Sequence, residues 1–203
     1  MIIGICGKSG SGKSTLGRQL LELIPNTVYL DMDKVGHQVL LIPEVKEKIV
    51  HTFGPYVLTE NELDRKKIGN IVFNSTEAFE RYSQIIWMYM KMLIDEFLKQ
   101  NEGKTIVLDA IKLNQTEYFG ICDIKVLLDI PYEVRKERAM KRDNITEEKF
   151  DLREQASIDY NEEEFDFVLK TNDYDDVKRL VRELWQKFYI QEVLILWQKD
   201  IWI

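Results

Sequence analysis

Residues 7–14 read Gly7-Lys8-Ser9-Gly10-Ser11-Gly12-Lys13-Ser14 and match the pattern G-x-x-x-x-G-K-[S/T] at every position. An apolar run, Ile2–Cys6, comes directly before them, and leucines with helical spacing follow. Glycines let the backbone curl so that successive N–H groups point inward, and the N-terminal end of the following helix adds positive partial charge. The stretch therefore predicts a strand, a phosphate-binding loop and a helix that together bind a nucleoside triphosphate. A Gly/Ser-rich turn that binds nothing is the alternative, and it leaves the flanking strand and helix unexplained.

Two side chains at the end of this loop have predicted chemical roles. Lys13 reaches the β- and γ-phosphates, and the hydroxyl of Ser14 can ligate Mg²⁺. The pattern thus predicts a nucleoside triphosphate and Mg²⁺ as the bound groups.

The composition restricts the class of protein. A chain of 203 residues with 45% hydrophobic and 31% charged residues is expected to form one soluble domain with a substantial core. Its net charge of −7 argues against nucleic acid or a membrane surface as a partner, because both attract basic proteins. Cys6 and Cys122 lack metal-type spacing, and Cys6 is expected in the core. With no signal peptide or membrane-spanning run expected, we predict a cytoplasmic protein.

Apolar and β-branched runs alternate with helical stretches along the chain. Near-continuous apolar runs of this kind favour parallel strands that are buried on both faces. We therefore predict an α/β fold of three layers, with a five-stranded parallel sheet and ligands at the carboxyl ends of its strands. The predicted strands are Ile2–Cys6, Thr27–Leu30, Thr105–Leu108, Ile124–Ile130 and Phe165–Lys170.

The gap between the second and third predicted strands is too long for one crossover helix. We interpret residues 34–103 as a helical insertion that binds the acceptor substrate, within a single domain (1–203) whose nucleotide-binding core is 1–33 and 104–172. A pair of scaffold helices that binds nothing remains the alternative. The helices predicted in the insertion are Glu44–Thr52, Asp64–Phe73 and Ser75–Gln100.

The C-terminal stretch, residues 173–203, is also predicted to be helical, and its end is apolar at Val193–Trp197 and Ile201–Ile203. Apolar surface at a terminus needs a cover. We expect it to pack on the sheet, and a contact between copies in a homo-oligomer is the second option. A helix that lies on a membrane is disfavoured because cationic residues are sparse there.

Three aspartates lie where predicted strands end. Asp31 and Asp33 stand two apart, so the strand period of two predicts that they share one face. A carboxylate at that edge can accept the proton of an attacking hydroxyl, and Asp33 is the better candidate because Asp31 suits a helix cap. Asp109 ends the third strand, as does the acidic residue that holds Mg²⁺ through water in related nucleotide-binding folds. A turn residue is the alternative for Asp109.

Arg135, Arg138 and Arg142 are spaced by three and four residues, which places their guanidinium groups on one helical face. Arginines in a lid region, here residues 132–160, can neutralise the charge that develops on a transferring phosphoryl group. A solvated helix surface is the alternative. His37 and His51 lie in amphipathic stretches with no Cys, His or carboxylate cluster at metal spacing, and we interpret both as ordinary helix residues.

At this point the chain resembles the dephospho-CoA kinase family over most of its length, to about residue 184. The stretch 63–73 is the most specific part of the resemblance. The matching segments are residues 4–15, 31–35, 53–54, 63–73, 138–143, 145–148, Gln155, 165–169 and Asn172.

The resemblance implies transfer of the ATP γ-phosphate to the ribose 3′-hydroxyl of dephospho-CoA. It implies Asp33 as the base, Lys13, Arg138 and Arg142 as groups that stabilise phosphate charge, and Arg65 with Asp33 on the acceptor side. Mg²⁺ would lie between Ser14 and, through water, Asp109. The residues implied to bind ATP are Gly7, Ser9, Gly10, Ser11, Gly12, Lys13, Ser14, Thr15, Arg142 and Asn172.

The sequence departs from the family pattern on the acceptor side. Ile86-Trp87 stand where the family has His-Pro, and residues 110–115 replace a Pro-Leu-Leu motif and a later Glu. Two alternatives therefore stay open: a kinase of another small acceptor, such as a nucleoside or nucleotide, and a catalytically degenerate nucleotide-binding protein. A GTPase-type switch is disfavoured, since no [N/T]-K-x-D motif follows the D-x-x-G pattern at residues 33–36.

Overall fold

The computed structural model describes residues 1–183 except 73, 156, 172 and 174. The chain divides into two compact units. The sheet unit contains Met1–Leu30 and the chain from Gly103 onwards, and the helical unit contains Asp31–Glu102. The helical unit corresponds closely to the insertion predicted at residues 34–103.

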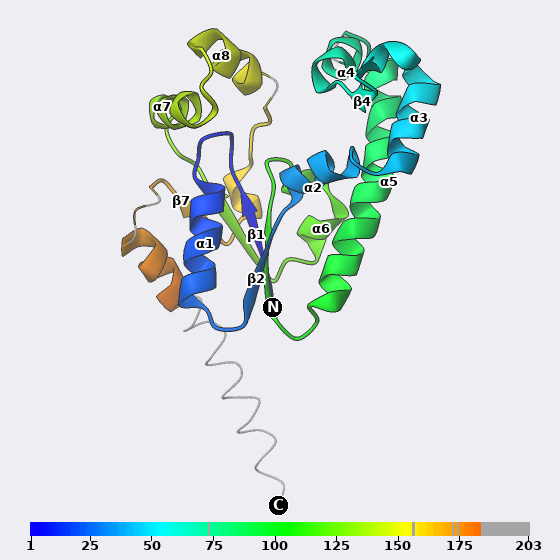
Figure 1. The fold of residues 1–203 in the computed structure, drawn as a ribbon. Helices are drawn as coiled ribbons and strands as arrows, with labels where there is room; N and C mark the ends of the chain where they lie inside the picture. The colour runs from blue at the N-terminus through cyan, green and yellow to red at the C-terminus, as the bar shows by residue number, and fades with distance from the viewer. Residues whose placement is uncertain (73, 156, 172, 174, 184–203) are drawn as a thin grey trace, which may run out of the picture. The chain divides into compact units, whose positions relative to one another are not determined.

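The sheet unit is built on a five-stranded sheet with the order β2-β5-β1-β6-β7 (Figure 1). The central strand β1 pairs in parallel with β5, where Ile3 lies opposite Val107, and with β6, where Ile3 lies opposite Ile124. The predicted five-stranded parallel sheet is confirmed, although the last two strands are shorter than predicted. The strands are β1 (Ile2–Cys6), β2 (Thr27–Asp31), β5 (Thr105–Asp109), β6 (Ile124–Leu128) and β7 (Phe167–Leu169).

Different residues pack against the two faces of β1. Ile3 and Ile5 are fully buried in a core with Leu16 and Leu20 of α1 (Lys13–Leu23). Helical residues 175–183 add Val177 to the same core, and Figure 1 shows this segment beside α1. The burial of these aliphatic side chains supplies most of the stability of the sheet unit.

On the opposite face, β1 approaches the chain that follows β5. A Cβ added at Gly4 would lie 2.6 Å from the sulfur of Cys122 and 3.0 Å from Leu113. Burial raises the pKa of the Cys6 thiol to about 12, which agrees with its predicted place in the core. The helical elements between β5 and β7 are η2 (Leu113–Gln115), α6 (Glu117–Gly120), α7 (Tyr132–Asp143), α8 (Glu147–Gln155) and η3 (Glu162–Glu164).

The helical unit is organised around its longest helix, α5 (Thr76–Gln100), which contacts α2 (Met32–Val39), α3 (Pro43–Phe53) and α4 (Arg65–Val72). The predicted helices agree with α3, α4 and α5 to within one residue at each end. A short 3₁₀ helix, η1 (Pro55–Val57), leads into a two-stranded hairpin of β3 (Leu58–Thr59) and β4 (Glu62–Leu63), which was not predicted. Its turn places Glu60 and Asn61 at φ of 47° and 64°, without the glycine that marks such turns in a sequence.

The predicted C-terminal helix is present at residues 175–183. Its apolar end at residues 193–203, and the oligomer contact predicted there, lie outside the described residues. Within the part of the chain that the structure describes, no helix combines the length and hydropathy needed to cross a bilayer.

Gly17 lies in the middle of α1, where glycine lowers helix stability. The ring of Tyr29 explains it, because a Cβ at this position would lie 2.3 Å from Tyr29 Cε2. The small residue on α1 therefore makes room for the aromatic ring of β2.

We predict that Gly17→Ala lowers the free energy of unfolding by about 1–3 kcal/mol, because the methyl group overpacks the Tyr29 ring. Chemical denaturation measures this change. Gly120→Ala in α6 is the matched control, since an added Cβ there meets nothing within 4 Å. A stability gain for Gly17→Ala, as helix propensity alone would give, would contradict the packing argument.

Candidate active site

The loop between β1 and α1 has the backbone shape that its glycines permit. Gly10 and Gly12 adopt φ of 80° and 93°, in the left-handed region that side chains disfavour. A Cβ on Gly10 would also lie 2.3 Å from the carbonyl oxygen of Arg135. The N–H of Ser11 donates to the carbonyl of Lys8 at 3.1 Å and closes the turn. Glycine at position 10 is thus required both by its φ and by the backbone packed against it.

The start of α1, directly after the loop, is suited to bind an anion. Gly12 is the N-cap residue of α1, so no side chain caps the helix. The N–H groups of Thr15 and Leu16 already donate to the carbonyl of Gly12. The preceding N–H groups at the start of the helix can serve phosphate oxygens, which the helix dipole favours.

Lys13 brings a cation to this loop. Its ammonium donates to the carbonyl of Gly7 at 2.9 Å and lies 3.9 Å from a carboxylate oxygen of Asp109. Only 10% of the Lys13 side chain is exposed. A partly desolvated ammonium held in this way interacts strongly with phosphate, because little water screens it.

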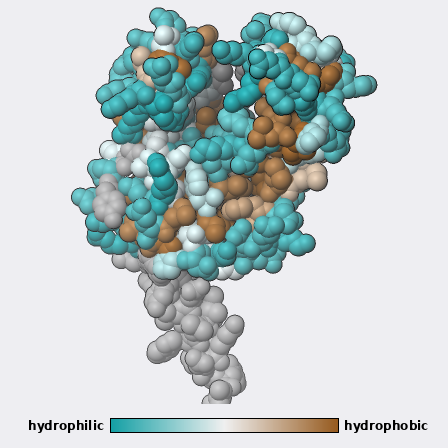
Figure 2. Space-filling view, viewed as in Figure 1, coloured by the Kyte–Doolittle hydropathy of each residue, from teal (hydrophilic) through white to brown (hydrophobic). Residues whose placement is uncertain are grey.

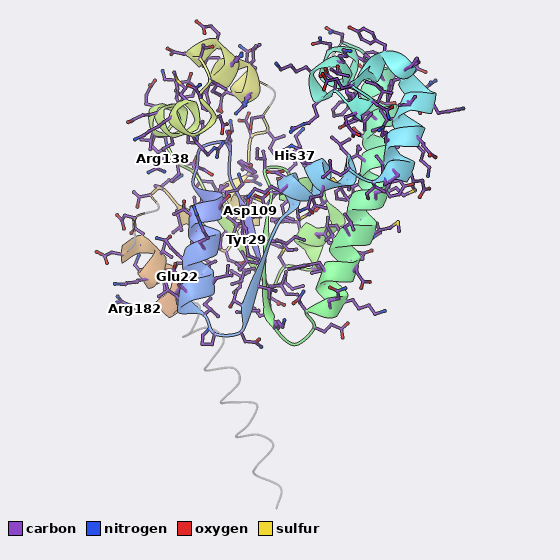
Figure 3. The ribbon with its side chains drawn as sticks, in the orientation of Figure 1. Glu22, Tyr29, His37, Asp109, Arg138 and Arg182 are labelled. Carbon is purple, nitrogen blue, oxygen red and sulfur yellow. The ribbon has the colours of Figure 1, made fainter. Side chains whose placement is uncertain are left out.

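Asp109 ends β5 and is 2% exposed. Its Oδ2 atom accepts hydrogen bonds from the hydroxyl of Ser14 at 3.4 Å and from the hydroxyl of Tyr29 at 2.5 Å. The structure therefore brings together the predicted pair Ser14 and Asp109. Figure 3 labels Tyr29 and Asp109 beside the N-terminal half of α1. No sequence signal indicated a role for Tyr29, because this strand residue is 80 positions away from Asp109.

The oxygen donors of Ser14 and Asp109 fit Mg²⁺, which binds hard oxygen ligands and keeps several waters. Among the described residues, no group of three or more His, Cys, Asp or Glu side chains is arranged to hold a metal ion by itself. A cation at Ser14 and Asp109 would thus share its coordination with water and phosphate oxygens, which is typical of Mg²⁺ in nucleotide sites.

Glu154 of α8 forms ion pairs with two cationic side chains, one of which belongs to the loop. It binds Arg135 of α7 through two hydrogen bonds of 2.7 and 2.8 Å, and it accepts from Lys8 at 3.2 Å. Arg135 is 5% exposed and also donates to the carbonyls of Ile130 and Ser9. These cations hold the pKa of the Glu154 carboxyl below its usual range, chiefly through Arg135.

The interpretation that all three arginines of α7 face a phosphoryl group is therefore wrong for Arg135. Its guanidinium is committed to Glu154 and to backbone carbonyls, because it is buried between α8 and the loop. Arg138 and Arg142 are exposed on α7, whose surface in Figure 2 is mostly hydrophilic. Arg142 donates to Asp143 at 2.7 Å and, with Arg153, lowers the pKa of the Asp143 carboxyl to about 2. The predicted phosphate-binding roles of Arg138 and Arg142 stay predictions.

We predict that Glu154→Gln lowers the free energy of unfolding by roughly 2–3 kcal/mol, because it leaves the buried Arg135 without its carboxylate. Urea denaturation measures the loss, and exposed Glu137→Gln on α7 is the matched control. Equal stability of the two variants would show that this ion pair does not support the loop.

In the helical unit, Asp31 and Asp33 occupy different structural positions. Asp31 is the last residue of β2 and the N-cap of α2, where its Oδ1 accepts from the N–H of Lys34 at 3.0 Å. Asp33 lies in the first turn of α2 and is exposed. The prediction that both share a strand face is wrong, since the chain turns into a helix at Met32. The predicted capping role of Asp31 is confirmed.

The segment Leu63–Val72 orients Arg65. The carboxylate of Asp64 accepts from the N–H groups of Lys66 and Lys67 at the start of α4 and from the hydroxyl of Thr59. The ammonium of Lys67 donates to the carbonyl of Leu58 at 2.7 Å. Asp64 and Lys67 thus make contacts within α4, the hairpin and η1, and Arg65 reaches α2.

Arg65 contacts His37 of α2, with 2.7 Å between its Nη2 atom and the Nε2 atom of the ring. Partial desolvation and the nearby guanidinium lower the pKa of His37, although the carboxylates of Asp33 and Asp31 oppose the shift. A neutral His37 can accept the hydrogen bond that Arg65 offers. His37 lies in α2 as predicted, and the contact with Arg65 of α4 is an addition that the sequence did not indicate.

We predict that His37 titrates below 6.5 in the folded protein, and that Arg65→Met raises its pKa because a neighbouring positive charge is removed. Proton NMR measures both values, and His51→Gln assigns the signals since the chain has two histidines. The unfolded state then binds more protons just below pH 6.5, so His37 makes the folded state less stable as the pH falls there. A pKa at or above 6.5 in the wild-type protein would contradict the contact.

The positions that differ from the family pattern are partly core positions. Ile86 of α5 is 8% exposed, and Leu113 of η2 is fully buried. Ile111 contributes through its backbone, since its carbonyl accepts a hydrogen bond from the hydroxyl of Tyr160 at 2.6 Å. Asn172, which the resemblance implies to bind ATP, lies outside the described residues.

Comparisons with known proteins identify the family of the chain. A family model described as dephospho-CoA kinase matches residues 1–175. The chain is 31% identical over 175 residues to a dephospho-CoA kinase from Fusobacterium nucleatum, covering 85% of this chain and 90% of that relative. It is 32% identical over 192 residues to a dephospho-CoA kinase from Aquifex aeolicus, covering 90% and 96%. The matched residues include both units.

Solved structures show the same fold. A crystal structure of the protein TT1252 from Thermus thermophilus has a TM-score of 0.79 at 26% identity, covering 92% of this chain and 97% of that chain. The dephospho-CoA kinase from Campylobacter jejuni has a TM-score of 0.55 at 22% identity, covering 92% and 96%. The second likeness concerns the fold alone.

Proposed function

The chain belongs to the dephospho-CoA kinase family, and we propose that it transfers the γ-phosphate of ATP to the ribose 3′-hydroxyl of dephospho-CoA, a step of coenzyme A biosynthesis. Membership in this family makes it a phosphotransferase that uses ATP. The observation that carries the proposal is the cluster of Lys13, Ser14 and Asp109 at the glycine-rich loop, in a chain that matches the family over residues 1–175.

On the ATP side, the chain supplies positive charge and oriented N–H groups. The loop from Gly7 to Thr15 surrounds the phosphates, and the ammonium of Lys13 stabilises the charge that develops on the β- and γ-phosphates. Bound Mg²⁺, held by Ser14 and through water by Asp109, would neutralise phosphate charge. Arg138 and Arg142 of α7 are the arginines that we assign to the transferring phosphoryl group, and Asn172 to the region of adenine.

On the acceptor side, Asp33 is the proposed base and Arg65 the proposed binding residue. The 3′-hydroxyl oxygen forms a bond to the γ-phosphorus while the bond from that phosphorus to the bridging oxygen of ADP breaks. The hydroxyl proton passes to the Asp33 carboxylate, and ADP leaves with the bond electrons. Arg65, at the start of α4 and in contact with His37, offers its guanidinium to an anionic part of the acceptor.

A second candidate is a kinase of another small acceptor, such as a nucleoside or nucleotide. The observation that favours it is the replacement of two family motifs by other residues, among which Ile86 and Leu113 are buried. A degenerate nucleotide-binding protein would share these replacements. The cytoplasm is the proposed location, and a homo-oligomer formed through the apolar C-terminal residues is a further proposal.

We predict that the wild-type protein releases ADP from ATP and Mg²⁺ only when dephospho-CoA is present, and that Asp33→Asn lowers kcat by about 100-fold or more. The loss follows because the amide cannot accept the hydroxyl proton. A coupled ADP assay measures both effects, and Asp95→Asn on the exposed surface of α5 is the matched control.

The same assay with nucleosides and nucleoside monophosphates separates the candidates. ADP release with one of these and not with dephospho-CoA would establish the second candidate. Nucleotide binding without phosphate transfer to any acceptor would identify a degenerate kinase. Full turnover by Asp33→Asn would show that another group accepts the proton.

A further inference from the structure

Tyr29 contacts the proposed metal site from outside the glycine-rich loop. Its hydroxyl donates to Oδ2 of Asp109 at 2.5 Å, and the hydroxyl of Ser14 donates to the same oxygen at 3.4 Å. Asp109 is 2% exposed, so protein groups rather than bulk water decide how its carboxylate is turned. The Tyr29 contact is the shorter of the two and comes from a residue with no assigned role.

The ring of Tyr29 is held in place independently of Asp109. It lies against Gly17 of α1, so closely that a Cβ there would be 2.3 Å from Cε2, 2.6 Å from Cδ2 and 3.2 Å from Cζ. Its backbone belongs to β2, a strand of the sheet that also contains β5. The hydroxyl is therefore a rigid donor, fixed by packing against the same helix that begins with Lys13 and Ser14.

We propose that Tyr29 is a positioning residue that orients the Asp109 carboxylate for Mg²⁺-bound nucleotide. The Ser14 hydroxyl has two partners, because its oxygen is a candidate ligand of the cation and its proton is donated to Asp109. The Tyr29 hydroxyl keeps Oδ2 hydrogen-bonded at any position of the Ser14 hydroxyl. Asp109 then presents one orientation before the nucleotide arrives, which reduces the ordering that binding requires. This inference rests on the proposed use of ATP and Mg²⁺.

The test is Tyr29→Phe, which removes the hydroxyl and keeps the ring against Gly17. Titration calorimetry with ADP in the presence of Mg²⁺ is expected to show about tenfold weaker binding, the size of one hydrogen bond to a charged group. Binding of ADP in EDTA is expected to stay within about twofold of wild type, because Asp109 acts through the cation. The Mg²⁺ concentration that half-saturates binding is expected to rise in parallel.

Tyr160→Phe is the matched control, since it removes a hydroxyl that donates to the carbonyl of Ile111 in the same unit. Both variants are checked by thermal melting, and the comparison with and without Mg²⁺ is made within each variant, so a general loss of stability cancels. Magnesium-dependent weakening in Tyr29→Phe and none in Tyr160→Phe supports the proposal.

Two outcomes overturn it. Wild-type affinity of Tyr29→Phe in Mg²⁺ would show that the hydroxyl does not orient the carboxylate, and equal weakening with and without Mg²⁺ would show that it serves the loop as a whole. Either result leaves the proposed function intact. Failure of the wild-type protein to bind ADP with Mg²⁺ would instead overturn the proposed function, and with it the basis of the inference.

Discussion

The phosphate loop depends on the close approach of its backbone to the start of α7. Gly10 leaves no room for a side chain beside the Arg135 carbonyl, and the Arg135 guanidinium donates to Ser9 and to Glu154. Apart from the Ser11 N–H, which closes the turn, loop N–H groups that are offered to a ligand cannot also hold the loop, so neighbouring elements have to support its shape. Arg135 and Glu154 provide that support, which explains why this arginine is buried while Arg138 and Arg142 of the same helix are exposed.

The carboxylates on which catalysis is proposed to depend have different surroundings that suit different tasks. Asp109 is buried at the end of a strand and held by Ser14 and Tyr29, as befits a group that orients water around a cation. Asp33 lies in the exposed first turn of α2, where an acceptor hydroxyl can reach it. Burial fixes the direction of the first carboxylate, and exposure leaves the second accessible to substrate.

The helical unit shows how a specific sequence stretch can be mostly structural. Asp64 caps α4 and holds Thr59, and Lys67 ties α4 to the hairpin. Arg65, the first residue of α4, contacts His37 of α2. Residues 64–67 thus combine local structural contacts with a contact to another helix.

Local pattern was enough to predict the sheet, the glycine-rich loop and the cap at Asp31, because strand period, turn geometry and capping depend on residues a few positions apart. The hairpin at 58–63 escaped prediction because its turn lacks glycine. Tyr29 and Asp109 are 80 residues apart, and His37 and Arg65 are 28 apart. Only the tertiary structure decides such contacts, because the order of strands and the packing of helices determine which distant side chains meet. The sequence by itself therefore determined where phosphate can bind, and the tertiary structure decided which residues hold the binding groups in place.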